Sequence, residues 1–295
     1  MTLPDKILEL PCWSGPPSGA PLEGGLSNEI WKITDDAGDH VVRFGADYPV
    51  HHVDRARELM STRAAHAAGF SPAVEYAAQG VMVTGFVQSR TWDAADMRRD
   101  PARVADLLKR FHNTMAANVS GTAYFFWVFH VIRDYARTLA NGNSRFAADL
   151  PGYLELSGQL EAAQVPLPIV FAHNDLLPAN ILEDDTRLWL IDYEYAGYST
   201  PMFDLAGVAS NSEMEPEAAQ ELLTHYFGAT PDRAMVRAFD AMQCASLLRE
   251  AMWAMVSELH LNAPGVDYVA YAHENLERLA AARDRYSSLY GKDVS

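Results

Sequence analysis

Cysteine and basic residues are both scarce in this chain of 295 residues. It contains two cysteines, Cys12 and Cys244, and 23 Lys and Arg side chains against 39 Asp and Glu. Two cysteines exclude a disulfide framework and a cysteine-ligated zinc site, so we expect a reducing, cytoplasmic location. The net charge of −16 argues against a nucleic-acid partner, because acids flank even the densest basic cluster, Arg98, Arg99 and Arg103.

Long apolar runs are also missing, since charges interrupt every hydrophobic stretch. We therefore expect no transmembrane helix and no membrane partner. The first eleven residues carry Asp5, Lys6 and Glu9 and so lack the uninterrupted apolar run that is typical of a signal peptide. With 49% hydrophobic and 21% charged residues, the composition is globular, and the length predicts two lobes rather than one core.

Strand patterns dominate the first part of the chain. Residues 11–25 are rich in Pro and Gly and predict an irregular segment. Turn-like residues at 36–39 and 79–80 separate short apolar runs, and a helix should end at Gly69. The predicted strands cover 30–34, 40–44, 74–78 and 81–87, and the predicted helix covers 53–68.

Helical periodicity takes over after Arg90. One apolar stripe is formed by Val104, Leu107, Leu108, Phe111 and Met115. Long helices are expected over 235–261 and 266–287, with a short β-like island at 169–171 and 188–191. The pattern predicts an α+β protein with a strand-rich lobe over 1–88 and a larger helical lobe over 89–295.

Three polar residues have the spacing that phosphoryl transfer needs. Asp175 and Asn180 form D-x-x-x-x-N, and Asp192 follows the apolar run 188–191. A kinase uses such an Asp to orient the attacking hydroxyl, and such an Asn and second Asp to hold Mg²⁺. Taken alone, the same residues also fit a helix cap, a turn and the end of a strand.

The wider segments HNDLLPANIL (173–182) and LWLIDYEYAGYSTPMFDLA (188–206) resemble the aminoglycoside phosphotransferase and choline/ethanolamine kinase superfamily, and the choline-kinase branch in particular. The resemblance implies a two-lobed protein-kinase-like fold, ATP as co-substrate and a Mg²⁺ requirement. It makes Asp175 the base, and Asn180 and Asp192 the metal ligands. Eight residues stand in the order and spacing of the family: His173, Asp175, Asn180, Asp192, Glu194, Tyr195, Phe203 and Asp204.

The resemblance also gives roles to neighbouring residues. It makes His173 and Asp204 structural supports of the catalytic loop. Glu194 remains open between a second metal, a cationic substrate and the lobe surface. Arg43 would bind phosphate and pair with Glu58, although Glu58 also fits a solvated helix face. The expected nucleotide-binding residues are Gly25, Ser27 and Asn28 of the glycine loop, Arg43, Glu58, and Thr84 and Phe86 of the hinge at 83–87.

The substrate is expected beside the last two helices. Trp253 and Tyr271 match aromatic positions of the choline-kinase pocket, but Glu250 stands where eukaryotic members carry a second Trp. Aromatic faces attract ammonium groups, whereas a carboxylate also pairs with primary amines. Core packing remains an alternative role for both aromatic residues.

We therefore expect a kinase of a small amino alcohol such as choline or ethanolamine, acting as a monomer or homodimer. Other alcohols (a hydroxyethylthiazole, an amino sugar, an aminoglycoside) and a catalytically silent kinase-like binding protein remain alternatives.

Overall fold

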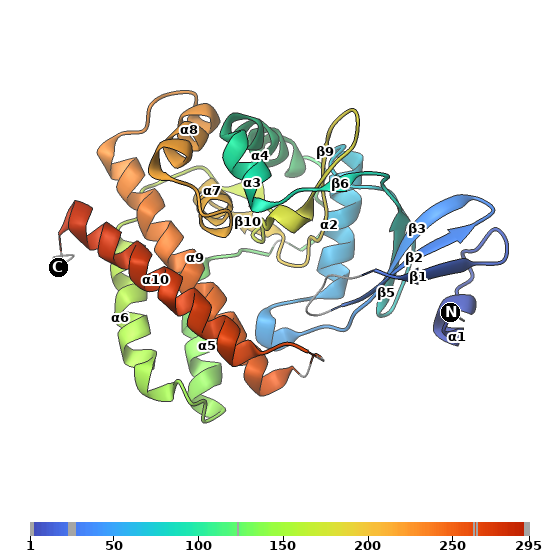
Figure 1. The fold of residues 1–295 in the computed structure, drawn as a ribbon, viewed down its shortest axis with the longest axis horizontal. Helices are drawn as coiled ribbons and strands as arrows, with labels where there is room; N and C mark the ends of the chain where they lie inside the picture. Colours follow the sequence, from blue (N-terminus) through green and yellow to red (C-terminus); the bar gives the residue numbers. More distant parts are fainter. Residues whose placement is uncertain (1–2, 23–27, 123, 262, 264, 292–295) are drawn as a thin grey trace.

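The computed structural model describes residues 3–22, 28–122, 124–261, 263 and 265–291. A five-stranded antiparallel sheet lies at one end of the molecule and a larger group of helices at the other (Figure 1). The strand order is β1-β2-β3-β5-β4. The strands are β1 Ser18–Pro21, β2 Glu29–Asp35, β3 Gly38–Phe44, β4 Val74–Ala78 and β5 Val81–Gly85.

Two tight turns explain the hairpins of this sheet. Between β2 and β3, the Asp35 carboxylate accepts a hydrogen bond from the N–H of Ala37 at 2.7 Å. Gly38 then has φ +142°, and Gly80 between β4 and β5 has φ +74°, both in a region that glycine enters without steric cost. The turns and the four strands expected here are confirmed, except that the strand predicted over 81–87 ends at Gly85.

Residues 11–25 differ from the expectation, because β1 lies within this Pro- and Gly-rich segment. β1 is an edge strand paired only with β2, and all four of its residues are exposed. An exposed edge strand needs no hydrophobic alternation and tolerates Pro21, which lacks a backbone donor. The sequence pattern that identifies strands is therefore missing from it.

Helix α2, Arg55–Ala67, crosses from the sheet to the helical part. It begins at Asp54, whose carboxylate accepts a hydrogen bond from the N–H of Arg57 at 2.7 Å. It ends before Gly69, which has φ +83°. α2 packs on β4 and buries Glu58 on the side of the sheet.

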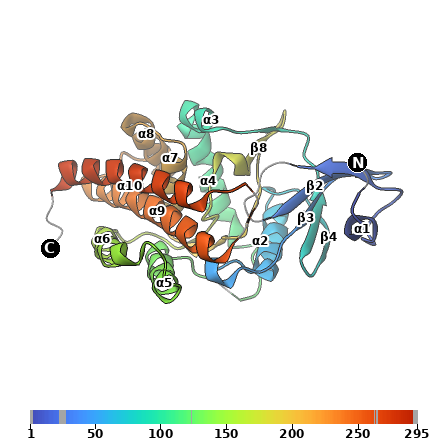
Figure 2. The ribbon, with the colours of Figure 1, turned by 60° about the horizontal axis from the view of Figure 1, so that its bottom comes forward.

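Helix α9 runs through the helical part beside α10 (Figure 2), and most of its residues are buried. α10 lies along α9, and α5, α6 and α7 pack on its other sides. None of the described helices is both long and apolar enough to cross a bilayer. The helices are α3 Ala94–Arg99, α4 Pro101–Met115, α5 Val128–Asn141, α6 Leu150–Ala162, α7 Pro201–Asn211, α8 Pro216–Phe227, α9 Arg233–His260 and α10 Tyr268–Tyr290, with α1 Asp5–Leu8 near the N-terminus and single turns at η1 Pro49–His51 and η2 Ala147–Asp149.

Two small sheets hold the segment on which the kinase prediction rests. β7 Val170–Ala172 pairs with β10 Gly197–Ser199, and β8 Ile181–Glu183 lies between β6 Arg90–Thr91 and β9 Leu188–Leu190. The expected single β-like island was therefore wrong in one respect, since its two strands belong to different sheets. The turn η3 Pro178–Asn180 lies just before β8.

Candidate active site

A cavity of about 610 Å³ lies between the sheet and the helical part. Strands β3 and β5 and helix α2 contribute one wall, and the segments around Asp175 and Asp192, together with α9 and α10, contribute the other. Twelve of the expected site residues line this single cavity. They are Asn28, Arg43, Glu58, Thr84, Phe86, Asp175, Asn180, Asp192, Glu194, Glu250, Trp253 and Tyr271.

A buried carboxylate, that of Asp204, holds the loop that carries Asp175. Asp204 of α7 accepts hydrogen bonds from the N–H groups of His173 and Asn174, at 2.9 and 2.7 Å. His112 of α4 contacts the same carboxylate through Nε2 at 2.9 Å. Burial opposes ionisation of Asp204, but these donors hold its pKa below the usual value.

His173 fixes the loop from the other side. Its Nε2 lies 3.0 Å from the carbonyl oxygen of Ile191, the residue before Asp192. The side chain is fully buried, and burial lowers its pKa. His173 does not line the cavity, so its contacts support the loop rather than a ligand.

Asp175 and Asn180 are tied together within the loop. The Asn180 amide donates from Nδ2 to the carbonyl oxygen of Asp175 at 2.9 Å, which leaves its amide oxygen as a possible ligand atom in a residue that lines the cavity. Burial raises the pKa of Asp175 well above its usual value; Arg249 opposes the shift, and Glu250 adds to it. A carboxylate of raised basicity accepts a proton from a hydroxyl more readily.

Asp192 follows a residue that is hydrogen-bonded to Asn180. The N–H of Ile191 donates to the carbonyl oxygen of Asn180 at 3.1 Å. Asp192 itself has φ +65°, an uncommon conformation for a non-glycine residue and one that clusters at functional sites. Its Oδ1 is buried and makes no hydrogen bond within the described residues, although Arg43 Nη1 lies 3.5 Å away.

These two residues fit a magnesium ion. A buried carboxylate oxygen that makes no hydrogen bond can accept a cation as a partner, and Asn180, whose backbone is hydrogen-bonded to Ile191, lines the same cavity as Asp192. Mg²⁺ takes oxygen ligands and is commonly held by one or two protein groups together with substrate phosphates. Among the described residues no cluster of three His, Cys, Asp or Glu offers an alternative all-protein metal site.

A network of arginine and glutamate side chains lines the wall on the side of the sheet. Arg43 of β3 forms an ion pair with Glu58 of α2, which is 2% exposed and therefore does not lie on a solvated helix face. Arg55 Nη1 lies 2.7 Å from Glu58 and 3.0 Å from Glu194. Burial and the nearby Asp192 raise the pKa of Glu194 to about 7.

For two residues of this network, Glu194 and Arg55, the structure differs from what the sequence predicts. Glu194 is 7% exposed and paired to Arg55, so it does not lie at the lobe surface. The sequence alone predicts no role for Arg55, because its partner Glu194 lies 139 positions further along the chain. No local pattern in the sequence marks a contact of that range.

The expected hinge is only partly free to bind adenine. The N–H of Phe86 donates to the carbonyl oxygen of Asp39 at 2.9 Å, so this donor is already used. Phe86 and Thr84 still contribute to the cavity wall. Of the glycine loop, Asn28 lines the cavity, whereas Gly25 and Ser27 lie outside the described residues.

The far end of the cavity has an aromatic and ionic wall. The rings of Trp253 and Tyr271 lie edge to face, with centroids 6.3 Å apart. Trp253 Nε1 donates to the Tyr195 hydroxyl at 3.1 Å, and the Tyr271 hydroxyl donates to Glu250 at 2.8 Å. Arg249 completes this wall and was not expected there. Trp253 and Tyr271 therefore pack against neighbours and also face the cavity that contains Asp175.

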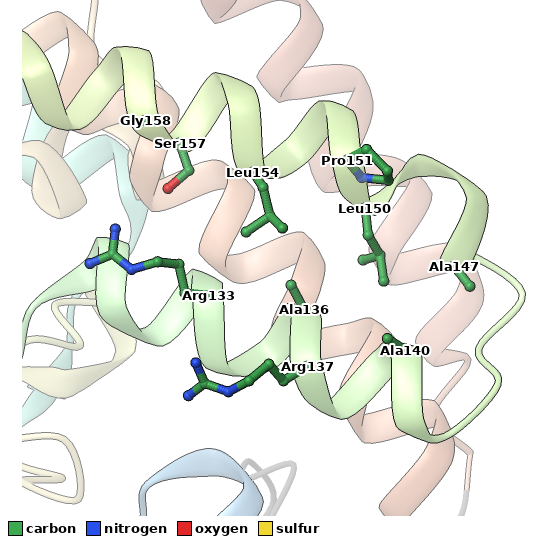
Figure 3. A pocket seen from close by; sticks show the side chains of 10 residues that line it. All are labelled: Arg133, Ala136, Arg137, Ala140, Ala147, Leu150, Pro151, Leu154, Ser157 and Gly158. Carbon is green, nitrogen blue, oxygen red and sulfur yellow. The ribbon is translucent and has the colours of Figure 1, made fainter.

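A second cavity, of about 630 Å³, lies between α5 and α6 (Figure 3). Its lining is mainly apolar, with Ala136, Ala140, Leu150 and Leu154, and the described residues that line it include no carboxylate. Without an acid it offers neither a base nor a metal ligand, so the cavity between sheet and helices is the candidate active site.

Comparison with known proteins agrees with this geometry. The family model for choline/ethanolamine kinases matches residues 20–280. The chain is 28% identical to LicA of Haemophilus influenzae over 217 residues, which is 70% of this chain and 62% of that protein. It is 25% identical to a probable ethanolamine kinase of Arabidopsis thaliana over 286 residues, which is 85% of this chain and 75% of that protein.

A crystal structure of a choline/ethanolamine kinase family protein from Mesorhizobium loti shares the fold, with a TM-score of 0.78 and 26% identity over 98% of both chains. The two-lobed α+β kinase-like fold expected from the sequence is thereby confirmed. The match of the family model over most of the chain shows that it belongs to the choline/ethanolamine kinase family.

Proposed function

We propose that this protein transfers the γ-phosphate of ATP to the hydroxyl group of a small amino alcohol of the choline or ethanolamine type. The observation that carries the proposal is the single cavity in which Asp175, Asn180 and Asp192 face Arg43 across the two lobes. Family membership adds independent support. The boundary between the lobes is proposed near residue 88, with residues 1–88 binding nucleotide and 89–295 supplying the catalytic loop.

In the proposed reaction, Asp175 orients the acceptor hydroxyl and takes up its proton. The hydroxyl oxygen forms a bond to the γ-phosphorus while the bond from that phosphorus to the leaving ADP oxygen breaks. Proton removal by a positioned carboxylate contributes roughly 10²–10⁴-fold to rate. Asp204 and His173 hold the loop that carries Asp175. This support matters because a displacement of about 1 Å in a reacting group can lower the rate by about 10²-fold.

Arg43 is proposed to bind the phosphates. Its Nη1 is buried and makes no hydrogen bond within the described residues, while Glu58 fixes the other end of the guanidinium. A buried N–H donor without a hydrogen bond costs free energy, and a phosphate oxygen in the cavity would satisfy it. Asn180 and Asp192 would hold Mg²⁺, which neutralises charge that develops on the transferred phosphoryl group.

The acceptor is proposed to bind against Trp253 and Tyr271, with its hydroxyl toward Asp175. All three residues line the same cavity. The scarcity of cysteine and the use of ATP support a cytoplasmic enzyme, and either a monomer or a homodimer is compatible with a cavity built from one chain.

Two assays on the purified protein test this proposal. A titration with a fluorescent ATP analogue, with Mg²⁺ and with excess chelator, should show Mg²⁺-dependent binding. An ADP-release screen across amino alcohols, amino sugars and thiazole alcohols should then give turnover with an amino alcohol. Turnover confined to the other acceptors, or nucleotide binding without any acceptor-dependent ADP release, would reject the proposed function.

A further inference from the structure

The acceptor end of the cavity contains a buried arginine. Arg249 of α9 is 4% exposed and lines the cavity together with Asp175 and Glu250. Long charged side chains are almost never this buried unless they are paired. The contacts of its guanidinium therefore decide what else can bind at this end.

Three contacts hold the guanidinium through Nη1 and the Tyr195 ring, whereas Nε and Nη2 are buried and make no hydrogen bond within the described residues. Nη1 lies 2.8 Å from a carboxylate oxygen of Glu250 and 3.8 Å from Asp175 Oδ1. The Cζ atom lies 4.5 Å from the centroid of the Tyr195 ring, within the range of a cation–π contact. An aromatic face and two carboxylates are the groups that an ammonium substrate would seek, and Arg249 already engages them.

Glu250 is also less available to pair with an ammonium substrate than its position in the sequence suggests. One of its oxygens bonds to Arg249, and the other accepts from the Tyr271 hydroxyl at 2.8 Å. Its negative charge is therefore balanced within the protein. Each oxygen still has a second lone pair, and the side chains of Glu250 and Asp175 retain 21% and 17% exposure, so a donor in the cavity can reach them.

We propose that Arg249 determines acceptor specificity by selecting a primary ammonium alcohol over a quaternary one; this inference rests on the proposed function. A quaternary ammonium has no N–H group and binds chiefly through aromatic faces. Here Arg249 covers the Tyr195 face, and its positive charge repels a second fixed cation nearby. A primary ammonium is smaller and gains charge-assisted hydrogen bonds from carboxylate oxygens that are still open.

The test measures kcat/KM for ethanolamine and for choline in the wild type and in Arg249→Met, which keeps much of the side-chain volume and removes the charge. The wild type should favour ethanolamine. In Arg249→Met the ratio should move toward choline by roughly three-fold to thirty-fold, the worth of one recovered cation–π contact. Because the readout is a ratio, a general loss of turnover does not imitate this result.

Two further variants separate charge from folding. Arg249→Lys retains a cation and should keep most of the preference for ethanolamine. If Arg249→Met does not fold, because Glu250 is left buried without its partner, the double variant Arg249→Met/Glu250→Gln removes both charges and should show the same shift. Arg278→Met is a matched control, since Arg278 bonds the carbonyl oxygen of Ser210 at 2.5 Å outside the cavity and should leave the ratio unchanged.

A ratio that stays constant in Arg249→Met and in the double variant would overturn the inference, and so would a wild type that prefers choline. In both cases amino alcohols are still phosphorylated and the proposed function survives. A wild type that phosphorylates neither compound would reject the proposed function itself.

Discussion

Replacing Asp204 by Asn tests how far the catalytic loop depends on one buried carboxylate. Asp204 is 1% exposed and accepts three hydrogen bonds, from the N–H groups of His173 and Asn174 and from His112. An Asn side chain has the same shape but only one acceptor oxygen. Whichever way its amide turns, its NH₂ group faces at least one of these donors and leaves that donor unpaired.

The expected cost follows from that count. The most favourable orientation keeps the amide oxygen toward His173 and His112 and leaves only the N–H of Asn174 unpaired. One unpaired buried donor costs about 1–3 kcal/mol. For a chain of this size, each kcal/mol lowers Tm by about 2–4 °C, so the fall should be roughly 2–12 °C. Because the two N–H groups belong to the loop of Asp175, kcat should also fall, by about 10²-fold for a displacement near 1 Å.

Differential scanning fluorimetry and steady-state ADP release measure the two effects. Asp240→Asn is the matched control, because Asp240 is also buried and binds Arg285 and Tyr290 outside the active-site cavity. The control should lower Tm and spare kcat. If Asp204→Asn matched the wild type in both quantities, or lowered Tm without changing kcat, the bracing role of Asp204 would be refuted.

Three further predictions follow from other contacts. Asp192→Ala should abolish Mg²⁺-dependent turnover, since the phosphates lose their metal, and undiminished wild-type turnover in excess chelator would contradict the metal assignment. Trp253→Ala should raise KM for the amino alcohol by a few-fold to about thirty-fold with a much smaller change in KM for ATP, and an equal change in both would remove Trp253 from the acceptor site. His51 lies between Tyr135 and Ser257, and burial, aided by the positive charges of Arg249, His260 and His52, lowers its pKa to about 3. Since the unfolded chain binds this proton more readily, the free energy of unfolding should fall as pH drops below about 6.5. His51→Gln should remove up to about 1.4 kcal/mol of that loss per pH unit, as measured by urea unfolding. Identical pH profiles for the variant and the wild type would contradict the buried neutral state of His51.

The parts of the fold that the sequence predicts are those with a local cause. The hairpins follow from turn residues such as Gly38 and Gly80, and α2 begins and ends at Asp54 and Gly69. Helix α9 was expected over 235–261 and is observed over Arg233–His260, because its apolar residues recur with helical spacing. Strand β1 escaped detection, since its exposed residues carry no such pattern.

The parts of the site that the sequence could not supply depend on contacts between distant segments. The segment 173–204 predicts roles for Asp175, Asn180 and Asp192, because their order and spacing resemble those of the kinase family. Arg55 gains its role only when α2 meets Glu194, and Arg249 only when α9 meets Tyr195 and Asp175. Arg249 and Glu250 are adjacent in a helix, a spacing that does not predict contact, so their ion pair is visible only in three dimensions.

The most direct measurement of the central claim is the product formed by the wild type and by Asp175→Asn from ATP, Mg²⁺ and ethanolamine, followed by phosphorus NMR. The wild type should form ADP and the phosphate monoester of the amino alcohol in equal amounts. Asp175→Asn should form the same products at least about 10²-fold more slowly while binding ATP nearly as well, because only the proton acceptor is lost. A wild type that forms no phosphate monoester, or an Asp175→Asn variant as fast as the wild type, would contradict the claim that this cavity transfers phosphate with Asp175 as its base.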